Sequence, residues 1–417
     1  FNISTKNKTE SAQEFGRYPL LFLEDMFKFK DMKWFNAGLK KAPTKRRYLV
    51  STAGQPNWGD EFITRAWIRW LAKSEPDSEI WLDCPNPSHA SLLFRNEHPH
   101  LHVVNTLWQL IWNTSDLLND SEAAAKKIRG WIRNGGTPRE DFGIDLLREM
   151  DTVHLLGGGY INQLWKANVL LLVALAQLKE LDPQILIYGT GLGLAPLEGV
   201  DLVLARMSFP AFDHLSVRDD KSADIAGVDC GFDDAFLEVA NTKFDWLERD
   251  LSARAFVCLQ QDVVGRNTQA VDAAVSSLLI SGVKRKEPVF LVEAIPPEDS
   301  WSLDLFKEQW DGDVWLLPFS HLWNRGFPGI DNAVWISSRF HMHLLGACAG
   351  ARGIAMGFGN EYYDIKHGSL MKLGTGWSSL DMSAESPVPV SAMVNADFQA
   401  EALRIARKKK NEAVRLY

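Results

Sequence analysis

Cysteine is scarce in this chain of 417 residues. The four cysteines are widely separated, and no pair has the spacing of a metal site: Cys84, Cys230, Cys258 and Cys348. Disulfide scaffolds are typical of short, cysteine-rich secreted chains, so the sequence does not predict one. The same scarcity favours a reducing compartment, and we expect no metal site.

Long apolar runs and an excess of positive charge are also missing. No stretch reaches the roughly 18 apolar residues that a membrane-spanning helix needs, and the longest candidate, Val169 to Leu178, predicts a buried helix. The formal net charge is -8, the opposite of the basic surface that nonspecific nucleic-acid binding requires. We therefore expect neither a membrane span nor a nucleic-acid partner.

What is present is a long alternation of strand-like and helix-like stretches. Such alternation predicts parallel, doubly wound α/β sheets. The expected strands of a first series are Arg47 to Thr52, Glu79 to Asp83, His102 to Val104, Thr152 to Leu156, Gln184 to Tyr188 and His214 to Val217. Those of a second series are Arg254 to Gln260, Pro288 to Glu293, Val314 to Leu317, Ala333 to Ile336 and Gly353 to Gly357.

These two series predict the division of the chain. With 46% hydrophobic residues, the chain can bury more than one core. We expect a partly disordered N-terminal arm over residues 1–45, Rossmann-like domains over 46–245 and 246–390, and a C-terminal helix over 391–417. The basic end of that helix is either a solvated helix end or a contact with an anionic membrane surface.

Glycine-rich stretches follow three strands of the first series, beginning at Gly54, Gly157 and Gly189. Glycines after a parallel strand let backbone N–H groups approach an anion, although they also occur in tight turns between strand and helix. The first stretch, Gly54 to Glu61, is neither a dinucleotide-binding G-x-G-x-x-G nor a P-loop.

The most informative stretch runs from Ala333 to Lys366. Polar residues follow a buried strand there, and a helix is expected from Leu344 to Ala351. Ligands of open α/β sheets bind at the carboxyl ends of the strands. Arg339 and His341 are therefore an anion clamp beside a proton-transfer group, or else a helix N-terminus that holds an arginine and a buried histidine.

Four stretches together resemble the polysaccharide pyruvyl transferase family: Asn57 to Glu61, Gly157 to Gly159, Ser216 to Asp219 and Ile336 to His341. Lys366 also stands where that family commonly has a lysine. The resemblance spans roughly residues 47–375, and Phe340 departs from the smaller aliphatic residue often found between the arginine and the histidine. We expect this difference to affect packing rather than chemistry.

The resemblance implies two Rossmann-like domains facing a cleft, as in GT-B glycosyltransferases. It also implies transfer of pyruvate from phosphoenolpyruvate onto two hydroxyls of a sugar, which forms a cyclic ketal. The acceptor is then a polysaccharide, glycolipid or glycan, and phosphoenolpyruvate is a co-substrate, so no cofactor is expected.

This donor carries a phosphate and a carboxylate, so it needs several cations. We assign Arg218, Arg339 and Lys366 to donor binding, together with Gly158, Gly159 and Ser338. For Arg218 the alternative is an ion pair with Asp219 or Asp220.

The reaction also needs an acid and a base, and we assign catalysis to His341, Asp60 and Arg339. His341 is the candidate acid for the donor's methylene carbon, because an imidazole titrates near neutral pH. Asp60 is the candidate base, and its alternative role is a helix N-cap. His343 is expected in the core, since residues two apart on a helix point in different directions. We assign acceptor binding to Asn57, Trp58 and Asn162.

Two other functions remain open at this point. One is a GT-B nucleotide-sugar glycosyltransferase, and the other is an inactive glycan-binding protein. We expect a cytoplasmic protein, with the inner membrane face as a site of peripheral contact. The alternative is the lumen of the secretory pathway, if an N-terminal anchor has been removed.

Overall fold

The computed structural model describes residues 45–117, 119–242, 255–261, 265–330, 333–359, 361–384, 387–393 and 398–417. The expected N-terminal arm, except for Lys45, lies outside these residues, and so does the expected domain boundary near residue 245.

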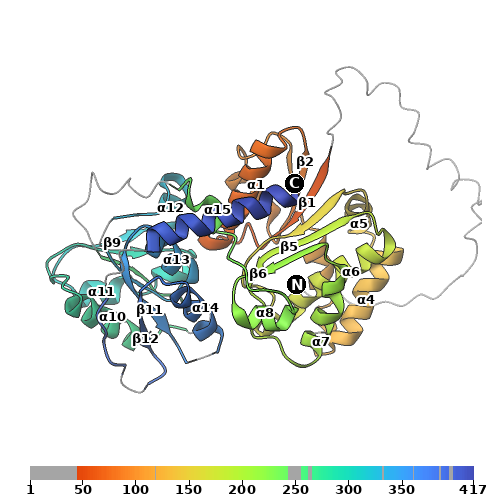
Figure 1. The fold of residues 1–417 in the computed structure, drawn as a ribbon. Coiled ribbons are helices and arrows are strands. Elements are labelled where there is room, and N and C mark those ends of the chain that lie inside the picture. Colours follow the sequence, from red (N-terminus) through yellow and green to blue (C-terminus); the bar gives the residue numbers. More distant parts are fainter. Residues whose placement is uncertain are drawn as a thin grey trace, which may run out of the picture. The chain divides into compact units, whose positions relative to one another are not determined.

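The first sheet has six strands, and every neighbouring pair is parallel (Figure 1). Its strands are β1 (Arg46–Val50), β2 (Glu79–Asp83), β3 (Leu101–Val104), β4 (Thr152–Leu155), β5 (Leu186–Leu192) and β6 (His214–Val217). The order across the sheet is β3-β2-β1-β4-β5-β6.

The second sheet repeats this arrangement. Its strands are β7 (Ala255–Cys258), β8 (Val289–Val292), β9 (Val314–Leu317), β10 (Val334–Ser337), β11 (Arg352–Gly357) and β12 (Ser378–Asp381). All neighbours are again parallel, in the order β12-β11-β10-β7-β8-β9. Numbered from its own first strand, each sheet therefore has the order 3-2-1-4-5-6 of a doubly wound Rossmann fold. The predicted fold of two such units is confirmed.

Helices connect successive strands in both halves. In the first half they are α1 (Trp58–Ser74), α2 (Pro87–Leu93), α3 (Leu107–Trp112), α4 (Ser121–Asn134), α5 (Asp141–Arg148), α6 (Val169–Leu181), α7 (Gly199–Ser208), α8 (Asp220–Ala226) and α9 (Phe236–Val239). In the second they are α10 (Thr268–Ile280), α11 (Leu303–Gln309), α12 (Phe319–Arg325), α13 (Phe340–Cys348) and α14 (Glu361–Lys372), and α15 (Phe398–Leu416) follows the last strand. Short 3-10 segments cover Ser115–Leu117, Gln163–Asn168, Phe209–Ala211 and Glu298–Ser300.

Two expected boundaries were wrong in ways that concern the site. Helix α13 begins at Phe340 rather than Leu344, because the Ser337 hydroxyl accepts the Arg339 N–H at 3.0 Å and tightens the turn after β10. Residues 189–192, expected in a loop, continue β5, since Gly189 and Leu192 pair with β6.

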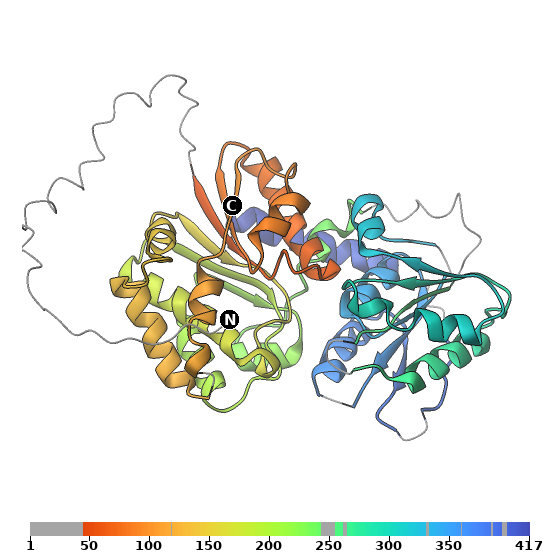
Figure 2. The ribbon, with the colours of Figure 1, turned by 180° about the vertical axis from the view of Figure 1, so that it is seen from behind.

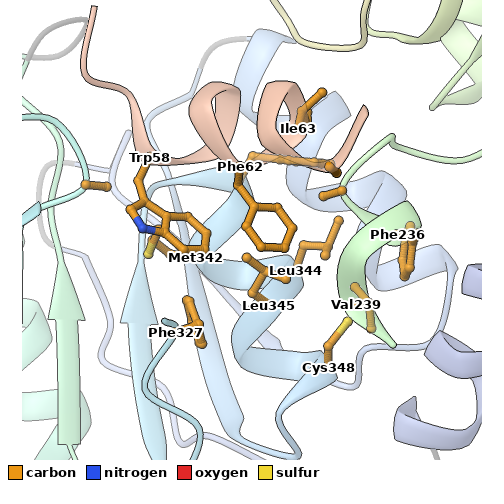
Figure 3. Packing of buried hydrophobic residues seen from close by; sticks show 14 of the residues in the cluster. Trp58, Phe62, Ile63, Phe236, Val239, Phe327, Met342, Leu344, Leu345 and Cys348 are labelled. Atoms are coloured by element: carbon orange, nitrogen blue, oxygen red, sulfur yellow. The ribbon is translucent and has the colours of Figure 1, made fainter. Parts of the chain in front are cut away.

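Alternate residues of each first strand face different cores, as the period of two in a strand requires. On β1, Leu49 belongs to a core cluster with α1, whereas Tyr48 and Val50 belong to one with α4 and α6. In the cluster that α1 shares with α13, Trp58 lies beside Met342, and the ring of Phe62 faces Leu344 and Leu345 (Figure 3). Helix α13, which carries His341, is therefore packed directly against α1, which carries Asp60.

Helix α15 returns the chain from the second half to the first. It packs against α13 and α9, and Figures 1 and 2 show it ending near β1. Lys409 is only 1% exposed, with Nζ 2.5 Å from Asp234 and 2.6 Å from Glu412. Burial lowers the pKa of Lys409, but these two carboxylates outweigh it, and the pKa is raised overall. The basic helix is thus in part a buried structural element. Among the described residues no helix is long and apolar enough to cross a membrane.

Candidate functional site

A pocket of about 590 Å³ lies where segments from both sheets meet. Its lining includes residues that follow β1, β4, β7 and β10. These strands flank the points at which the strand order reverses in each sheet, where ligands of doubly wound proteins bind. The topology therefore places the pocket where a substrate site is expected.

Most of the sequence-predicted site residues line this one pocket. They are Asn57, Asp60, Gly159, Arg218, Ser338, Arg339, His341 and Lys366. They come from five separate segments of the chain, and the fold brings them together.

Arg218 is held by a partner that the sequence did not indicate. Its Nη1 donates to Asp233 Oδ2 at 2.8 Å, and both side chains are almost fully buried. The guanidinium also lies over the ring of Phe340, 4.2 Å from its centroid, so this residue contributes a cation–π contact. The alternative partners of Arg218 were wrong, because Asp219 caps α8 and Asp220 pairs with Lys372.

Arg339 is fixed in a similar way by Asp299. Its Nη2 donates to Asp299 Oδ1 at 2.6 Å, and its Nε lies 3.1 Å from Oδ2. The same carboxylate accepts the N–H groups of Ala294 and Ile295, which follow β8. A bidentate pair of this kind holds a guanidinium plane in one orientation.

His341 lies between Asp233 and the first turn of α1. Its Nε2 is 3.4 Å from Asp233 Oδ1, and its Nδ1 would lie 1.9 Å from a Cβ added to Gly59. Burial raises the pKa of Asp233, but His341 and Arg218 outweigh it and hold that pKa well below its usual value. Asp233 is therefore an anion that touches both the predicted clamp and the predicted acid.

The glycine loop after β4 brings two cations close together. A Cβ on Gly159 would lie 2.6 Å from Arg218 Nη2 and 3.1 Å from Lys366 Nζ. Gly158 has a φ of 149°, a conformation that favours glycine, and its hypothetical Cβ would lie 3.5 Å from Asp60 Oδ1. The loop thus lies beside the predicted base, Asp60, and beside two residues that are predicted to bind the donor, Arg218 and Lys366.

Asp60 is not the N-cap of α1. Asn57 has that position without a side-chain capping bond, and its Nδ2 donates instead to Asp60 Oδ2 at 2.9 Å. Asp60 stands in the first turn and lines the pocket. The neighbouring Glu61 is buried and accepts the Gly54 N–H at 2.7 Å. Burial raises the pKa of Glu61 well above its usual value, so this side chain shapes the loop.

Three predicted ligand residues lie outside the pocket lining: Gly158, Trp58 and Asn162. The assignment of Trp58 to the acceptor needs correction, because this side chain is fully buried and its ring stacks on Phe62 at 4.9 Å. Asn162 is 1% exposed, and its amide donates to Gly159 O and accepts from Leu164 N. Asn162 therefore supports the glycine loop from a position outside the pocket lining.

His343 lies in the core, as expected. It is fully buried, with Nδ1 3.0 Å from His367 Nδ1 and Nε2 2.9 Å from the Thr375 hydroxyl. Burial lowers the pKa of His343 well below its usual value and that of His367 to about 4. Within the described ranges, no group of three or more His, Cys, Asp or Glu side chains is arranged to hold a metal ion.

Sequence reasoning missed Asp233 and Asp299, and although some of the 16 tryptophans could be expected beside a sugar, it did not select those that line the pocket. Neither aspartate stands in a recognisable motif. The one usable signal was indirect, since a buried arginine requires a carboxylate partner. The sequence contains 53 acidic residues, so that requirement alone selects none of them.

The fold and pocket together define a two-domain, doubly wound α/β protein with a pocket at its strand ends that is lined by cationic side chains. The family model described as polysaccharide pyruvyl transferase matches residues 57–257. The resemblance inferred from the motifs is confirmed over those residues, and the match indicates a pyruvyl transferase enzyme. Three of the four motif stretches lie inside it, whereas Ile336 to His341 and Lys366 lie beyond it. No curated protein matches the chain.

Several solved structures are similar in outline. A UDP-GlcNAc 2-epimerase from Methanocaldococcus jannaschii has a TM-score of 0.48 and 10% identity over 88% of this chain and 99% of its own. The epimerase from Neisseria meningitidis bound to UDP-GlcNAc has a TM-score of 0.48 and 9% identity, over 89% and 100%. A spinosyn rhamnosyltransferase complexed with spinosyn aglycone has a TM-score of 0.45 and 12% identity, over 88% and 96%.

Proposed function

We propose that this protein transfers pyruvate from phosphoenolpyruvate onto two hydroxyls of a sugar and forms a cyclic ketal. The observation that carries the proposal is the convergence of Arg218, Arg339, Lys366 and His341 on one pocket. These residues come from both halves of the fold, and the family match ends before Arg339, His341 and Lys366.

The cations suit a donor with two anionic groups. Phosphoenolpyruvate carries a phosphate and a carboxylate on three carbons, and arginine binds such groups with paired N–H donors. The carboxylates of Asp233 and Asp299 hold the two guanidinium groups in place before any ligand arrives. A ligand therefore meets an oriented clamp, which reduces the entropy lost on binding.

The acid and base account for the bond changes. His341 gives a proton to the methylene carbon of the donor, while a sugar hydroxyl attacks the neighbouring carbon and its proton passes to Asp60. Phosphate then leaves with the electrons of its C–O bond and takes up the proton held by Asp60, which frees the base. The second hydroxyl attacks the same carbon and closes the ketal, and its proton passes to solvent through the base. A positioned proton-transfer group contributes about 10²- to 10⁴-fold to such a rate.

Donor binding tests this proposal directly. We expect phosphoenolpyruvate to raise the melting temperature, because a ligand at about 100 times its Kd stabilises the native state by about 2.7 kcal/mol. Phosphoenolpyruvate without effect, beside a clear shift with UDP-glucose, would move the assignment to a nucleotide-sugar glycosyltransferase.

Alanine variants localise the donor. A hydrogen bond to a charged group contributes about 1.5–3 kcal/mol. Arg218→Ala and Arg339→Ala should therefore each raise the Kd for the donor, measured by calorimetry, about 10- to 150-fold. Arg352→Ala is the matched control, because Arg352 begins β11 and donates to Ser281 O, away from the pocket lining. Circular dichroism confirms that each variant is folded. Equal donor affinity in all three variants would contradict the clamp.

A further inference from the structure

The pocket is larger than its proposed donor requires. A three-carbon phosphate ester fills only part of about 590 Å³, and the predicted acceptor residue Trp58 lies in the core. The pocket lining does contain three tryptophans: Trp108, Trp112 and Trp165.

Two of these tryptophans are exposed. Trp112 is 41% exposed and Trp165 is 40% exposed, whereas Trp67 and Trp335 are fully buried. An exposed indole leaves a large apolar surface in water, which is unfavourable in the absence of a ligand. Both exposed rings belong to the lining of the same pocket.

The segment that carries Trp165 is tied to the donor loop. Asn162 donates to Gly159 O at 2.7 Å and accepts from Leu164 N at 2.9 Å, so one side chain joins the glycine loop to the turn that presents Trp165. Asn168 closes that turn by donating to Tyr160 O at 2.8 Å. The 3-10 segment Gln163–Asn168 also packs against α3, which ends at Trp112. Trp165 is thus tied to the glycine loop beside the predicted donor-binding cations, and Trp112 ends a helix that packs against the segment of Trp165.

We propose that Trp112 and Trp165 form the binding platform for the acceptor sugar. This inference rests on the proposed function and names the residues that select its second substrate. A pyranose ring has faces of C–H groups and an edge of hydroxyls. The faces bury apolar area against an indole, which is rigid and loses little conformational entropy on binding. The hydroxyl edge is then left for polar groups.

The platform defines a class of acceptor. A terminal hexose that lies on the tryptophans can direct a pair of hydroxyls toward Asp60, which lines the same pocket. The remainder of an oligosaccharide or glycolipid extends outward past the exposed rings. The acceptor is therefore a hexose at the end of a glycan, bound through its C–H face.

Glycoside binding can be measured without the donor. Saturation-transfer NMR and calorimetry with p-nitrophenyl β-galactoside, β-glucoside and α-mannoside report sugar contact directly. We expect Trp112→Ala and Trp165→Ala each to raise the Kd for the glycoside about tenfold, or to abolish its binding. The Kd for phosphoenolpyruvate should stay within about twofold. Trp315→Ala is the matched control, because Trp315 is 53% exposed and lies on β9 outside the pocket lining.

The two proposals fail in different ways. Wild-type glycoside affinity in both pocket variants would overturn the platform, and so would a wild-type protein that binds none of the three glycosides. Loss of glycoside binding in the pocket variants but not in Trp315→Ala supports the platform. That result holds whether or not phosphoenolpyruvate binds, whereas failure of phosphoenolpyruvate alone overturns only the donor assignment.

Discussion

Gly59 is the position at which a single methyl group tests the role of His341. A Cβ added there would lie 1.9 Å from His341 Nδ1, and real Cβ contacts are essentially never shorter than 3.0 Å. The imidazole must therefore move by roughly 1 Å in Gly59→Ala. A displacement of about 1 Å in an active site can lower the rate about 10²-fold. We expect this loss in turnover, with nearly unchanged affinity for phosphoenolpyruvate, because the donor cations are untouched.

Two comparisons separate this effect from general damage. Gly130 lies in α4 with nothing within 4 Å of its hypothetical Cβ, so Gly130→Ala should keep wild-type turnover and gain about 0.5–1 kcal/mol of stability. In the double variant Gly59→Ala/His341→Ala, the rate should equal that of His341→Ala alone, because both changes act on one group. Wild-type phosphate release by Gly59→Ala, measured with a coupled assay, would refute the assignment of His341 as the acid.

Four further predictions concern the same neighbourhood. Asp233→Asn should lower turnover by about 10²-fold and the free energy of unfolding by about 3–5 kcal/mol, since it breaks a buried pair and releases His341; kinetics and urea unfolding measure both. His341→Ala should lower turnover about 10²- to 10⁴-fold and leave donor affinity nearly unchanged, whereas His343→Ala should mainly lower the melting temperature. An inactive His343→Ala variant together with an active His341→Ala variant would assign the acid to His343 instead. Arg339→Lys should bind phosphoenolpyruvate almost as poorly as Arg339→Ala in calorimetry, because lysine lacks the planar fork; full affinity would exclude bidentate binding. The pKa of His367 is about 4 in the folded protein and about 6.5 in the unfolded chain, so the unfolded chain takes up a proton first as the pH falls. The contribution of His367 to the free energy of unfolding should therefore be fully present above pH 6.5 and decrease toward pH 4. Urea titrations that give equal free energies of unfolding at pH 7 and pH 5 would contradict this.

The repeating part of the fold could be predicted from the sequence. Buried parallel strands are short apolar runs, and each of the strands expected in the two series has a counterpart in the described structure. The exceptions were informative. The stretch from Gly189 to Leu192 continues β5 because its backbone pairs with β6, and glycine content alone gives no sign of such pairing. Strand β12 was not anticipated, since Ser378–Asp381 is not an apolar run.

The site was predictable where motif residues follow strands, and not where contacts depend on the tertiary fold. Arg218, Arg339 and His341 line the pocket because each follows the end of a parallel strand. Asp233 and Asp299 reach them across 15 and 40 residues of sequence, so no local pattern could indicate them. For tryptophans, spacing does not distinguish a core residue from a pocket residue, because both satisfy the same apolar pattern.

The most direct test of the account is the product formed from phosphoenolpyruvate and a glycoside. The reaction is run in heavy water and analysed by mass spectrometry and NMR, with UDP-glucose in a parallel reaction. We predict an acceptor that gains the elements of pyruvic acid less one water, one phosphate released for each ketal, and one deuterium in the ketal methyl group, because the methylene carbon takes its third hydrogen from solvent through the acid. An acceptor that gains a hexose from UDP-glucose, and nothing from phosphoenolpyruvate, would contradict it.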